Sequence, residues 1–541
     1  MKIALAQLNY HVGNFEANTS KIIAAIQKAE QENADLIVFS ELAICGYPPR
    51  DFLEFEEFIE ECGKSIDSIA QHCTTIAAIV GSPSKNNNQR GKKLYNSAYF
   101  LNNGKVEDIF HKTLLPNYDI FDEYRYFEPN RNFHLLEFKG EKIAVSICED
   151  LWNITEQMYE LDPMEELAKL KPSLIINIAA SPFNYNQEKD RKKVLKATFD
   201  KYQLPIVYCN HVGAQTELIF DGGSIFINAK GELQNELNYF EEDFATIDTT
   251  EIAAPKTQIE QSKIALIHHA LISGIRDYFG KLGFKKALVG LSGGIDSAVV
   301  YAMAAEALGN ENVMGVLMPS QFSSDHSVSD ARKLATNLSA EQHLIEIEPL
   351  FAAFSEQLAP LFQNLPFNLA EENLQARIRG TLLMAVSNKF GHILLNTTNK
   401  SEAAVGYGTL YGDMNGGLSI LGDLYKLEVY DLARYINHDK EIIPLNSIEK
   451  APSAELRPGQ KDSDSLPEYD ILDQILYQYI ELRKGPDAII HQGFDEATVK
   501  KVLKMVNTTE YKRHQTPPIL RVSSKAFGTG RRMPIVGKYL A

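Results

Sequence analysis

A glutamate, a lysine and a cysteine in the first half of the chain lie where apolar segments end. Glu41 ends one predicted strand, Cys148 follows another, and Lys112 lies in a segment between them. Each has an ordinary structural explanation, as a surface acid, a solvated base or a small core side chain. Together they predict an amidase. A thiolate attacks the amide carbon, a carboxylate moves the thiol proton to the departing ammonia, and an ammonium stabilises the oxyanion.

The second chemical feature is the glycine-rich turn Ser292-Gly-Gly-Ile-Asp-Ser297. The apolar run 287–291 predicts a strand before it, and the alanine-rich run 298–308 predicts a helix after it. Two adjacent glycines let the backbone approach a ligand, and a helix N-terminus with Ser hydroxyls favours an anion. Because no Lys follows the glycines, this is not a Walker-type loop. Asp296 adds a carboxylate that would hold Mg²⁺ against phosphates.

The composition is that of an ordinary globular protein. The chain has 541 residues, enough for about two to four domains, with 44% apolar and 23% charged residues. A net charge of −17 argues against nucleic acid as the main partner. Five cysteines without a CxxC pair are typical of reduced thiols in the cytosol. We expect a cytoplasmic homo-oligomer with no signal peptide, no membrane-spanning segment and only small-molecule substrates.

Hydrophobic patterns divide the chain into a first domain at 1–245, a linker at 246–262 and a second domain at 263–541. In the first domain, many strands with helices at intervals suggest a layered sandwich. The predicted strands are 2–7, 35–41, 75–80, 96–101, 142–147, 174–179, 206–208 and 224–228, and the predicted helices are 17–31, 54–71, 155–170 and 188–203.

The second domain alternates strands and helices, which predicts a mostly parallel sheet with helices on both faces and ligands at the carboxyl ends of its strands. Besides 287–291, strands are expected at 313–319, 344–347 and 392–396, and helices at 264–282 and 376–390. Near those ends, Glu402 would be a second oxygen ligand for Mg²⁺, and Lys426 offers a charge for phosphates. Ordinary capping or surface roles are the alternative for both.

The motifs resemble known families. Ser-Gly-Gly-Ile-Asp-Ser resembles the loop of ATP pyrophosphatases, which adenylate an oxygen, release pyrophosphate and let a nucleophile displace AMP. The trio Glu41, Lys112 and Cys148 resembles the nitrilase superfamily, whose fold is an α-β-β-α sandwich. That resemblance implies an oxyanion hole completed by the backbone N–H of Glu149, and a supporting acid, for which Glu123 is our candidate.

Further motifs narrow the resemblance. The segments that look like those of NAD synthetases are Glu372–Gly380, Asn399–Glu402, Tyr411–Asp413, Ala451–Arg457 and Tyr511–His514. With the nitrilase-like part in front, the chain resembles the glutamine-dependent NAD synthetases. The expected fold class is α/β, with an N-terminal α-β-β-α sandwich and a C-terminal doubly wound sheet of the adenine nucleotide hydrolase type.

The resemblance also implies binding residues. Tyr118, Ser181 and Gln187 occupy glutamine-binding positions; the last usually holds Lys, so Lys189 is an alternative. Lys512, in a segment ending Gln515–Pro518 that has the pattern of a mobile loop, would close over deamido-NAD. The complete implied sets are Gly290, Leu291, Ser292, Gly293, Gly294, Ile295, Asp296, Ser297, Thr397, Lys426 and Ser453 for ATP, Asn373, Glu402 and Lys512 for deamido-NAD, and Asp296 and Glu402 for the metal.

The implied reaction is adenylation of deamido-NAD by ATP with Mg²⁺, followed by amidation with ammonia from glutamine. A carboxylate is a poor electrophile, and a mixed anhydride with AMP makes it reactive. Two alternatives stay open. An amide ligase for another acid would be separated by a screen of pyrophosphate release across acids. A non-catalytic metabolite-binding protein would be excluded by any ATP turnover.

Overall fold

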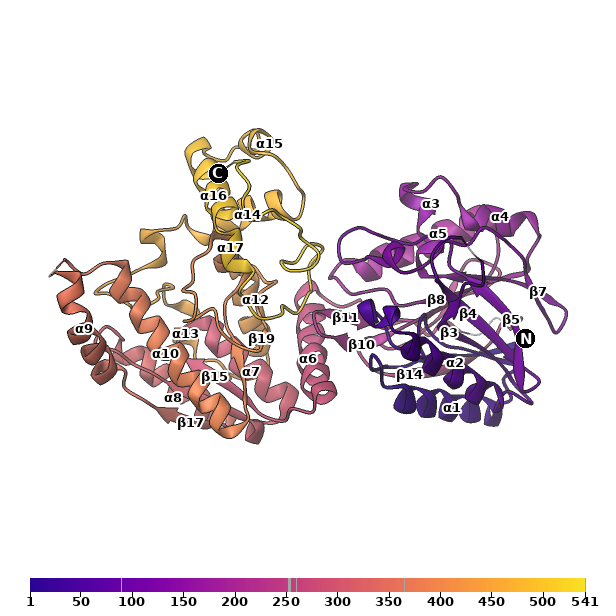
Figure 1. Ribbon diagram of the computed structural model, residues 1–541, viewed down its shortest axis with the longest axis horizontal. Coiled ribbons are helices and arrows are strands. Elements are labelled where there is room, and N and C mark those ends of the chain that lie inside the picture. Colours follow the sequence, from indigo (N-terminus) through magenta and orange to yellow (C-terminus); the bar gives the residue numbers. More distant parts are fainter. Residues whose placement is uncertain (89, 252–253, 259, 364, 541) are drawn as a thin grey trace. The chain divides into compact units, whose positions relative to one another are not determined.

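The computed structural model describes residues 1–541 apart from 89, 252–253, 259, 364 and 541, and it forms two compact units, Met1–Gln261 and Ser262–Ala541 (Figure 1). The first unit continues past the predicted boundary at 245. Its last strand, β14 (Asp243–Asp248), pairs antiparallel with β1 (Lys2–Gln7). The predicted linker 246–262 includes residues 252, 253 and 259, which lie outside the described residues.

The first unit contains two six-stranded sheets and a two-stranded one. In sheet order, the first consists of β14, β1, β2 (Leu36–Val38), β3 (Ala77–Lys85), β4 (Leu94–Asn102) and β5 (Lys105–His111). The second consists of β13 (Leu233–Glu236), β12 (Ile225–Ile227), β9 (Ile206–Asn210), β8 (Leu174–Ala179), β7 (Glu141–Ile147) and β6 (Leu136–Phe138), and β10 (Val212–Gln215) pairs with β11 (Leu218–Asp221). The helices are α1 (Phe15–Gln31), α2 (Glu56–Ala70), α3 (Asn153–Glu156), α4 (Pro163–Lys169) and α5 (Gln187–Tyr202), with 3₁₀ turns η1 (Arg50–Glu54), η2 (Glu123–Arg125) and η3 (Cys148–Leu151).

The side chains of β1 alternate between two hydrophobic cores, one on each face of the first sheet, and this alternation produces the layers of the first unit. Ile3 and Leu5 point into a core shared with the second sheet, and Ala4 and Ala6 point into a core shared with α1 and α2. Successive strand side chains face opposite sides of a sheet, so one strand serves both cores. The expected α-β-β-α sandwich is confirmed.

The single helix predicted at 155–170 is wrong. The chain forms α3 and α4 instead, because Gln157 adopts a left-handed conformation (φ 47°) that ends α3. Asp162 then caps α4 by accepting from the backbone N–H of Met164, and Pro163 takes the first helical position.

The second unit is built on one sheet whose described pairings are all parallel, as predicted. Its order is β17 (Glu341–Leu344), β16 (Val313–Leu317), β15 (Ala287–Leu291), β18 (Ile393–Asn396) and β19 (Leu418–Ser419). The order reverses between β15 and β18, and such a switch point opens a ligand crevice at the carboxyl ends of the strands. The strand predicted at 344–347 overlaps β17 only at Leu344, because this exposed edge strand carries polar residues that hide it from an apolar pattern.

Helices surround this sheet, and α7 and α10 both contact β15 (Figure 1). The helices are α6 (Lys263–Leu282), α7 (Ile295–Leu308), α8 (Asp325–Leu338), α9 (Glu348–Phe362), α10 (Leu369–Phe390), α11 (Lys400–Val405), α12 (Lys426–Ile436), α13 (Leu445–Glu449), α14 (Tyr469–Ile480), α15 (Pro486–Ile490), α16 (Glu496–Thr508) and α17 (Glu510–Arg513), with 3₁₀ turns η4 (Asn310–Asn312) and η5 (Asp462–Asp464). Within the described residues, no helix is both long and apolar enough to span a membrane.

Candidate active sites

The first site forms where three strands of the first unit end. Glu41 lies shortly after β2, Lys112 directly follows β5, and Cys148 directly follows β7. All three side chains are buried. Lys112 Nζ lies 2.7 Å from Glu41 Oε1. Cys148 has φ 44°, in the left-handed region that non-glycine residues seldom adopt outside strained, functional turns.

Glu123, the predicted supporting acid, joins this centre from η2. Lys112 Nζ lies 2.8 Å from Glu123 Oε2, so its ammonium is held between two carboxylates. Tyr47 donates its hydroxyl proton to Glu123 Oε1 at 2.8 Å, and Asn96 Nδ2 donates to Glu41 Oε1 at 2.7 Å. The sequence motifs indicated neither Tyr47 nor Asn96, because each contacts an acid far away in the chain.

Burial sets the protonation of this centre. It raises the pKa of the Cys148 thiol well above its ordinary value, Glu41 raises it further, and Lys112 opposes both. Burial also raises the pKa of Glu123 to about 7, with Lys112 again opposing. For Lys112, burial disfavours the charge, but Glu123 and Glu41 raise its pKa well above the ordinary value. The resting centre therefore contains a neutral thiol beside a charged ammonium, and the thiol needs a base.

Asp150 connects the lysine segment to the nucleophile turn. Its Oδ1 accepts the backbone N–H groups of Thr113 and Leu114 at 3.0 and 2.8 Å. These bonds fasten the residues that follow Lys112 to the turn that begins at Cys148. Since Asp150 is buried, this link is shielded from water and holds the two catalytic groups in register.

The structure brings two of the three predicted glutamine-binding residues into contact. Gln187 Nε2 donates to Ser181 Oγ at 2.9 Å. Tyr118, the third, donates its hydroxyl proton to Glu149 Oε1 at 2.8 Å. The alternative Lys189 pairs with an exposed carboxylate, that of Glu260. Of these two candidates, Gln187 is therefore the residue that contacts Ser181.

The second site begins at the Ser292–Ser297 turn, which links β15 to α7 as predicted. Gly293 has φ 76°, and a Cβ there would lie 2.1 Å from the carbonyl oxygen of Ser327, so only glycine fits. The Ser292 and Ser297 hydroxyls lie 3.1 Å apart, and the Gly294 N–H donates to Ser292 Oγ at 3.2 Å. These bonds give the turn a defined shape before any ligand binds.

Asp296 and Glu402 both contact Lys426. Lys426 Nζ lies 2.5 Å from Asp296 Oδ2 and 3.4 Å from Glu402 Oε1. Asn399 donates to Asp296 Oδ1 at 2.9 Å and caps α11, the helix of Glu402. Burial raises the pKa of Glu402 to about 8, Asp296 raises it further, and Lys426 lowers it. The structure therefore brings the two predicted metal ligands together around one cationic group.

A cavity of about 310 Å³ lies over this centre, within the size range of small-molecule sites. The predicted residues that line it are Gly290, Leu291, Ser292, Gly294, Ile295, Asp296, Ser297, Thr397, Glu402, Lys426 and Ser453. The sequence reasoning missed Arg379, Lys450, Glu455 and Asp462, which also line it. Arg379 and Glu455 lie inside motifs already noted, so their charges were an available signal.

The two remaining residues predicted for deamido-NAD contact one segment just beyond α11. Lys512 Nζ donates to the carbonyl oxygens of Gly406 and Gly408 at 2.7 and 2.8 Å. Asn373 Oδ1 accepts from the Thr409 hydroxyl at 2.7 Å. Lys512 lies in the short helix α17 and is half-buried, so the backbone at this residue is helical where the sequence suggested a loop.

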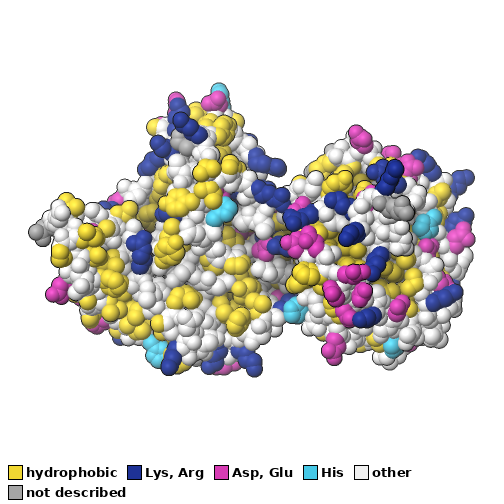
Figure 2. All heavy atoms as spheres, viewed as in Figure 1, with side chains coloured by type: hydrophobic (Ala, Val, Ile, Leu, Met, Phe, Trp, Pro, Cys, Tyr) yellow, Lys and Arg dark blue, Asp and Glu magenta, His cyan; other side chains and the backbone are white. Residues whose placement is uncertain are grey.

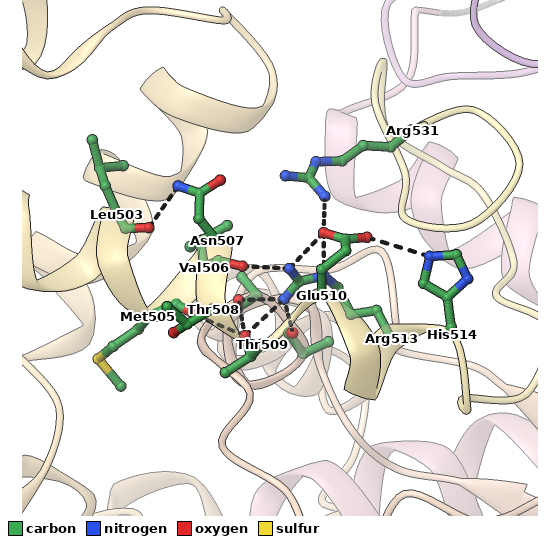
Figure 3. Close-up of polar contacts among 12 residues, drawn as sticks. Leu503, Met505, Val506, Asn507, Thr508, Thr509, Glu510, Arg513, His514 and Arg531 are labelled. Carbon is green, nitrogen blue, oxygen red and sulfur yellow. Dashed lines mark hydrogen bonds and ion pairs between the residues drawn. The ribbon is translucent and has the colours of Figure 1, made fainter. Parts of the chain in front are cut away.

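Helix α17 also holds the end of α11. Arg513 Nη1 donates to the carbonyl oxygens of Ala403 and Ala404 at 3.1 and 2.7 Å. Glu510 Oε2 accepts from Arg513 Nη2 and from Arg531 Nη1, both at 2.7 Å (Figure 3). The C-terminal segment is thereby tied to the helix that carries Glu402.

The other end of α11 is held by a fully buried lysine. Lys400 Nζ lies 2.8 Å from Asp423 Oδ1, donates to Ser523 Oγ at 2.8 Å and also pairs with Glu481. All three charged side chains have no exposed surface. Both ends of this short helix are therefore anchored to residues of the C-terminal segment.

Comparisons with known proteins agree with this division of chemistry. Residues 2–256 match the sequence model of the carbon–nitrogen hydrolases, and residues 267–516 match that of NAD synthase. The chain thus combines a carbon–nitrogen hydrolase unit with an NAD synthase unit.

Full-length relatives define the family. The glutamine-dependent NAD(+) synthetase of Synechocystis sp. is 44% identical, with 98% of each chain covered. That of Thermotoga maritima is 41% identical over 100% of this chain and 99% of its own. The solved glutamine-dependent NAD+ synthetase of Acinetobacter baumannii, in complex with ADP, is 38% identical, with a TM-score of 0.79 over 99% of this chain and 98% of its own. This chain belongs to the glutamine-dependent NAD synthetase family, which confirms the resemblance seen in its motifs.

Proposed function

We propose that the chain converts deamido-NAD, ATP and glutamine to NAD, AMP, pyrophosphate and glutamate. The observation that carries this proposal is the Lys112 ammonium held between Glu41 and Glu123 beside Cys148, in a chain that also has the nucleotide-type cavity. The relatives named above supply the identity of the acid, since the cavity by itself would accept other carboxylates.

In the first unit, Glu41 takes the proton of the Cys148 thiol, and the thiolate attacks the glutamine amide carbon. Lys112 and the backbone N–H of Glu149 stabilise the oxyanion. Glu41 returns the proton to the departing ammonia, and water then releases glutamate from the thioester. Glu123 keeps Lys112 charged and aimed, since its carboxylate lies 2.8 Å from Nζ.

In the second unit, the turn at Ser292–Ser297 holds the phosphates of ATP. The nicotinate oxygen attacks the α-phosphate, and ammonia then displaces AMP from the acyl carbon. Lys426 offers a positive charge beside the leaving pyrophosphate. Asn373 and Lys512 form hydrogen bonds with the segment 406–409, which we assign to the binding of deamido-NAD.

The residues present fit a magnesium ion. Asp296 and Glu402 supply hard carboxylate oxygens directed at one point, which Lys426 Nζ contacts. The described part of the chain has no group of three or more His, Cys, Asp or Glu side chains suited to a metal, so phosphate and water oxygens would complete the coordination. Bound there, Mg²⁺ would neutralise charge on the pyrophosphate.

The test is product analysis with deamido-NAD, ATP, Mg²⁺ and glutamine, run in parallel on Cys148→Ala. The wild type should form NAD and AMP. The variant should lose glutamine-dependent synthesis yet form NAD from ammonium salt, faster at higher pH because more free ammonia is present. A wild type that turns over ATP only with another acid would refute the proposed substrate.

We also propose that the protein is cytoplasmic and self-associates. The five cysteines are free thiols, as in a reducing compartment.

No residue of α9 is buried, and hydrophobic side chains gather on the surface over α9 and the start of α10 (Figure 2). Leu361 and Leu365 are 74% and 70% exposed, which favours a second copy packing there. Light scattering should give an oligomer for the wild type and a smaller species for Leu361→Glu/Leu365→Glu; an unchanged mass would refute this interface.

A further inference from the structure

The charged centre of the second unit is assembled from three helices. Asp296 lies in the first turn of α7, Glu402 lies in α11, and Lys426 is the first residue of α12. Helix α11 has only six residues, too few to be stable alone, so its position depends on what packs around it. A contact that fixes α11 against α12 therefore also fixes Glu402 against Lys426.

Asp473 makes that contact from α14. Its Oδ1 accepts the hydroxyl proton of Ser401, and its Oδ2 accepts the backbone N–H of Leu427 at 2.9 Å. Ser401 Oγ in turn accepts the backbone N–H of Lys426 at 2.9 Å. Ser401 precedes Glu402 in the chain, and Leu427 follows Lys426. One carboxylate thus joins the neighbours of both charged groups.

Burial strengthens this link. Asp473 is 5% exposed, and Ser401 is fully buried. Burial raises the pKa of Asp473 to about 6, with its bonds to Ser401 and Leu427 opposing, so the carboxyl is ionised at neutral pH. The first N–H groups of a helix have no partner within it, and a carboxylate is favoured there by the helix dipole. The bonds to Asp473 are therefore of the strong, charge-assisted kind.

Asp473 supports the cavity without lining it. The three charged groups of the centre line the cavity, whereas Asp473 is not among the described residues that do. One turn earlier in α14, Tyr469 donates its hydroxyl proton to the cavity residue Asp462 at 3.0 Å, so α14 supports the cavity at two points. Mg²⁺ requires nearly ideal octahedral geometry, so a small displacement of one ligand weakens its binding.

We infer that Asp473 is a positioning residue for adenylation, which holds Glu402 and Lys426 in the arrangement that receives magnesium and the phosphates of ATP. It acts through the neighbours of these two residues and does not touch the ligands itself. The inference rests on the proposed function, since it explains the geometry of the proposed magnesium site.

The first test measures magnesium dependence in the full chain, with deamido-NAD, ATP and ammonium salt. For Asp473→Asn, the Mg²⁺ concentration that gives half-maximal pyrophosphate release should rise about 10- to 100-fold, the usual effect of losing a residue that orients metal ligands. Basal glutamine hydrolysis, measured without ATP, should be unchanged. The control Asp470→Asn, at an exposed aspartate of the same helix, should match the wild type in both assays.

The second test measures binding instead of activity. In calorimetry with α,β-methylene-ATP, Mg²⁺ should tighten binding to the wild type, and Asp473→Asn should lose about tenfold of that gain. Binding without Mg²⁺ should be the same for both proteins. A purely structural role predicts less folded protein, with an unchanged Mg²⁺ midpoint and an unchanged gain in affinity, and that result would overturn the inference.

Ser401→Ala tests the same link if Asp473→Asn does not fold. It removes the hydroxyl between Asp473 and Lys426, so it should also raise the Mg²⁺ midpoint. The double variant should be no worse than Asp473→Asn, since the two side chains act as one network. An unchanged midpoint in Ser401→Ala, or additive losses in the double variant, would contradict the inference. Failure of the proposed function is a different result, because the wild type would then release no pyrophosphate with deamido-NAD at any Mg²⁺ concentration.

Discussion

Replacing Lys400 tests how the structure positions α11. The change Lys400→Met keeps the length of the side chain and removes its charge. It leaves Asp423 and Glu481 fully buried without their cation. Removing one partner of a buried ion pair typically costs about 3–5 kcal/mol. Since domains are stable by only about 5–15 kcal/mol, the second unit should lose a large part of its stability.

The assay is urea unfolding followed by circular dichroism, with hydrogen exchange to locate the change. Exchange should accelerate in α11, in α14 and in the segment 521–525, which share the cluster. Trp152, the one tryptophan of the chain, lies in the first unit, so its fluorescence follows the unit that the substitution does not touch.

A matched control is Lys500→Met, at an exposed lysine paired with exposed Glu496. It should leave unfolding unchanged, because exposed pairs contribute little. Adding Glu481→Gln to Lys400→Met should restore part of the stability by removing one uncompensated charge. A loss below about 1 kcal/mol for Lys400→Met would refute the reasoning, since it falls outside the range for a broken buried pair.

The remaining predictions concern the two sites. Burial raises the pKa of Glu123 to about 7, so this carboxyl is ionised above that pH and protonated below it. The rate of glutamine hydrolysis should therefore fall as the pH drops from about 8 to about 6. A similar fall in the Glu123→Gln variant would exclude this carboxyl as the cause. Asp296→Asn should reduce pyrophosphate release at least about 100-fold with either nitrogen source while glutamine hydrolysis persists, and near-normal release would remove Asp296 from the metal site. Lys512→Ala should raise KM for deamido-NAD about tenfold and leave that for glutamine unchanged; equal changes would leave the lysine only its packing role against the 406–408 carbonyls.

Local patterns predicted much of the fold. The strand–turn–helix around Ser292–Ser297 and the strand before Cys148 lie where their apolar runs indicated. The patterns failed at β14, whose acidic surroundings resemble a linker, and at the exposed edge strand β17. In both cases the strand is stabilised by its neighbour in the sheet, which a local window does not contain.

The sequence by itself determined which chemical groups are present and where each one stands relative to its own strand or helix, because those depend on neighbours a few residues away. Only the tertiary structure decided which groups meet. Lys112 lies between Glu41 and Glu123 because segments from distant parts of the chain converge. Burial then sets their charges, since the cost of an ion inside a protein depends on everything packed around it.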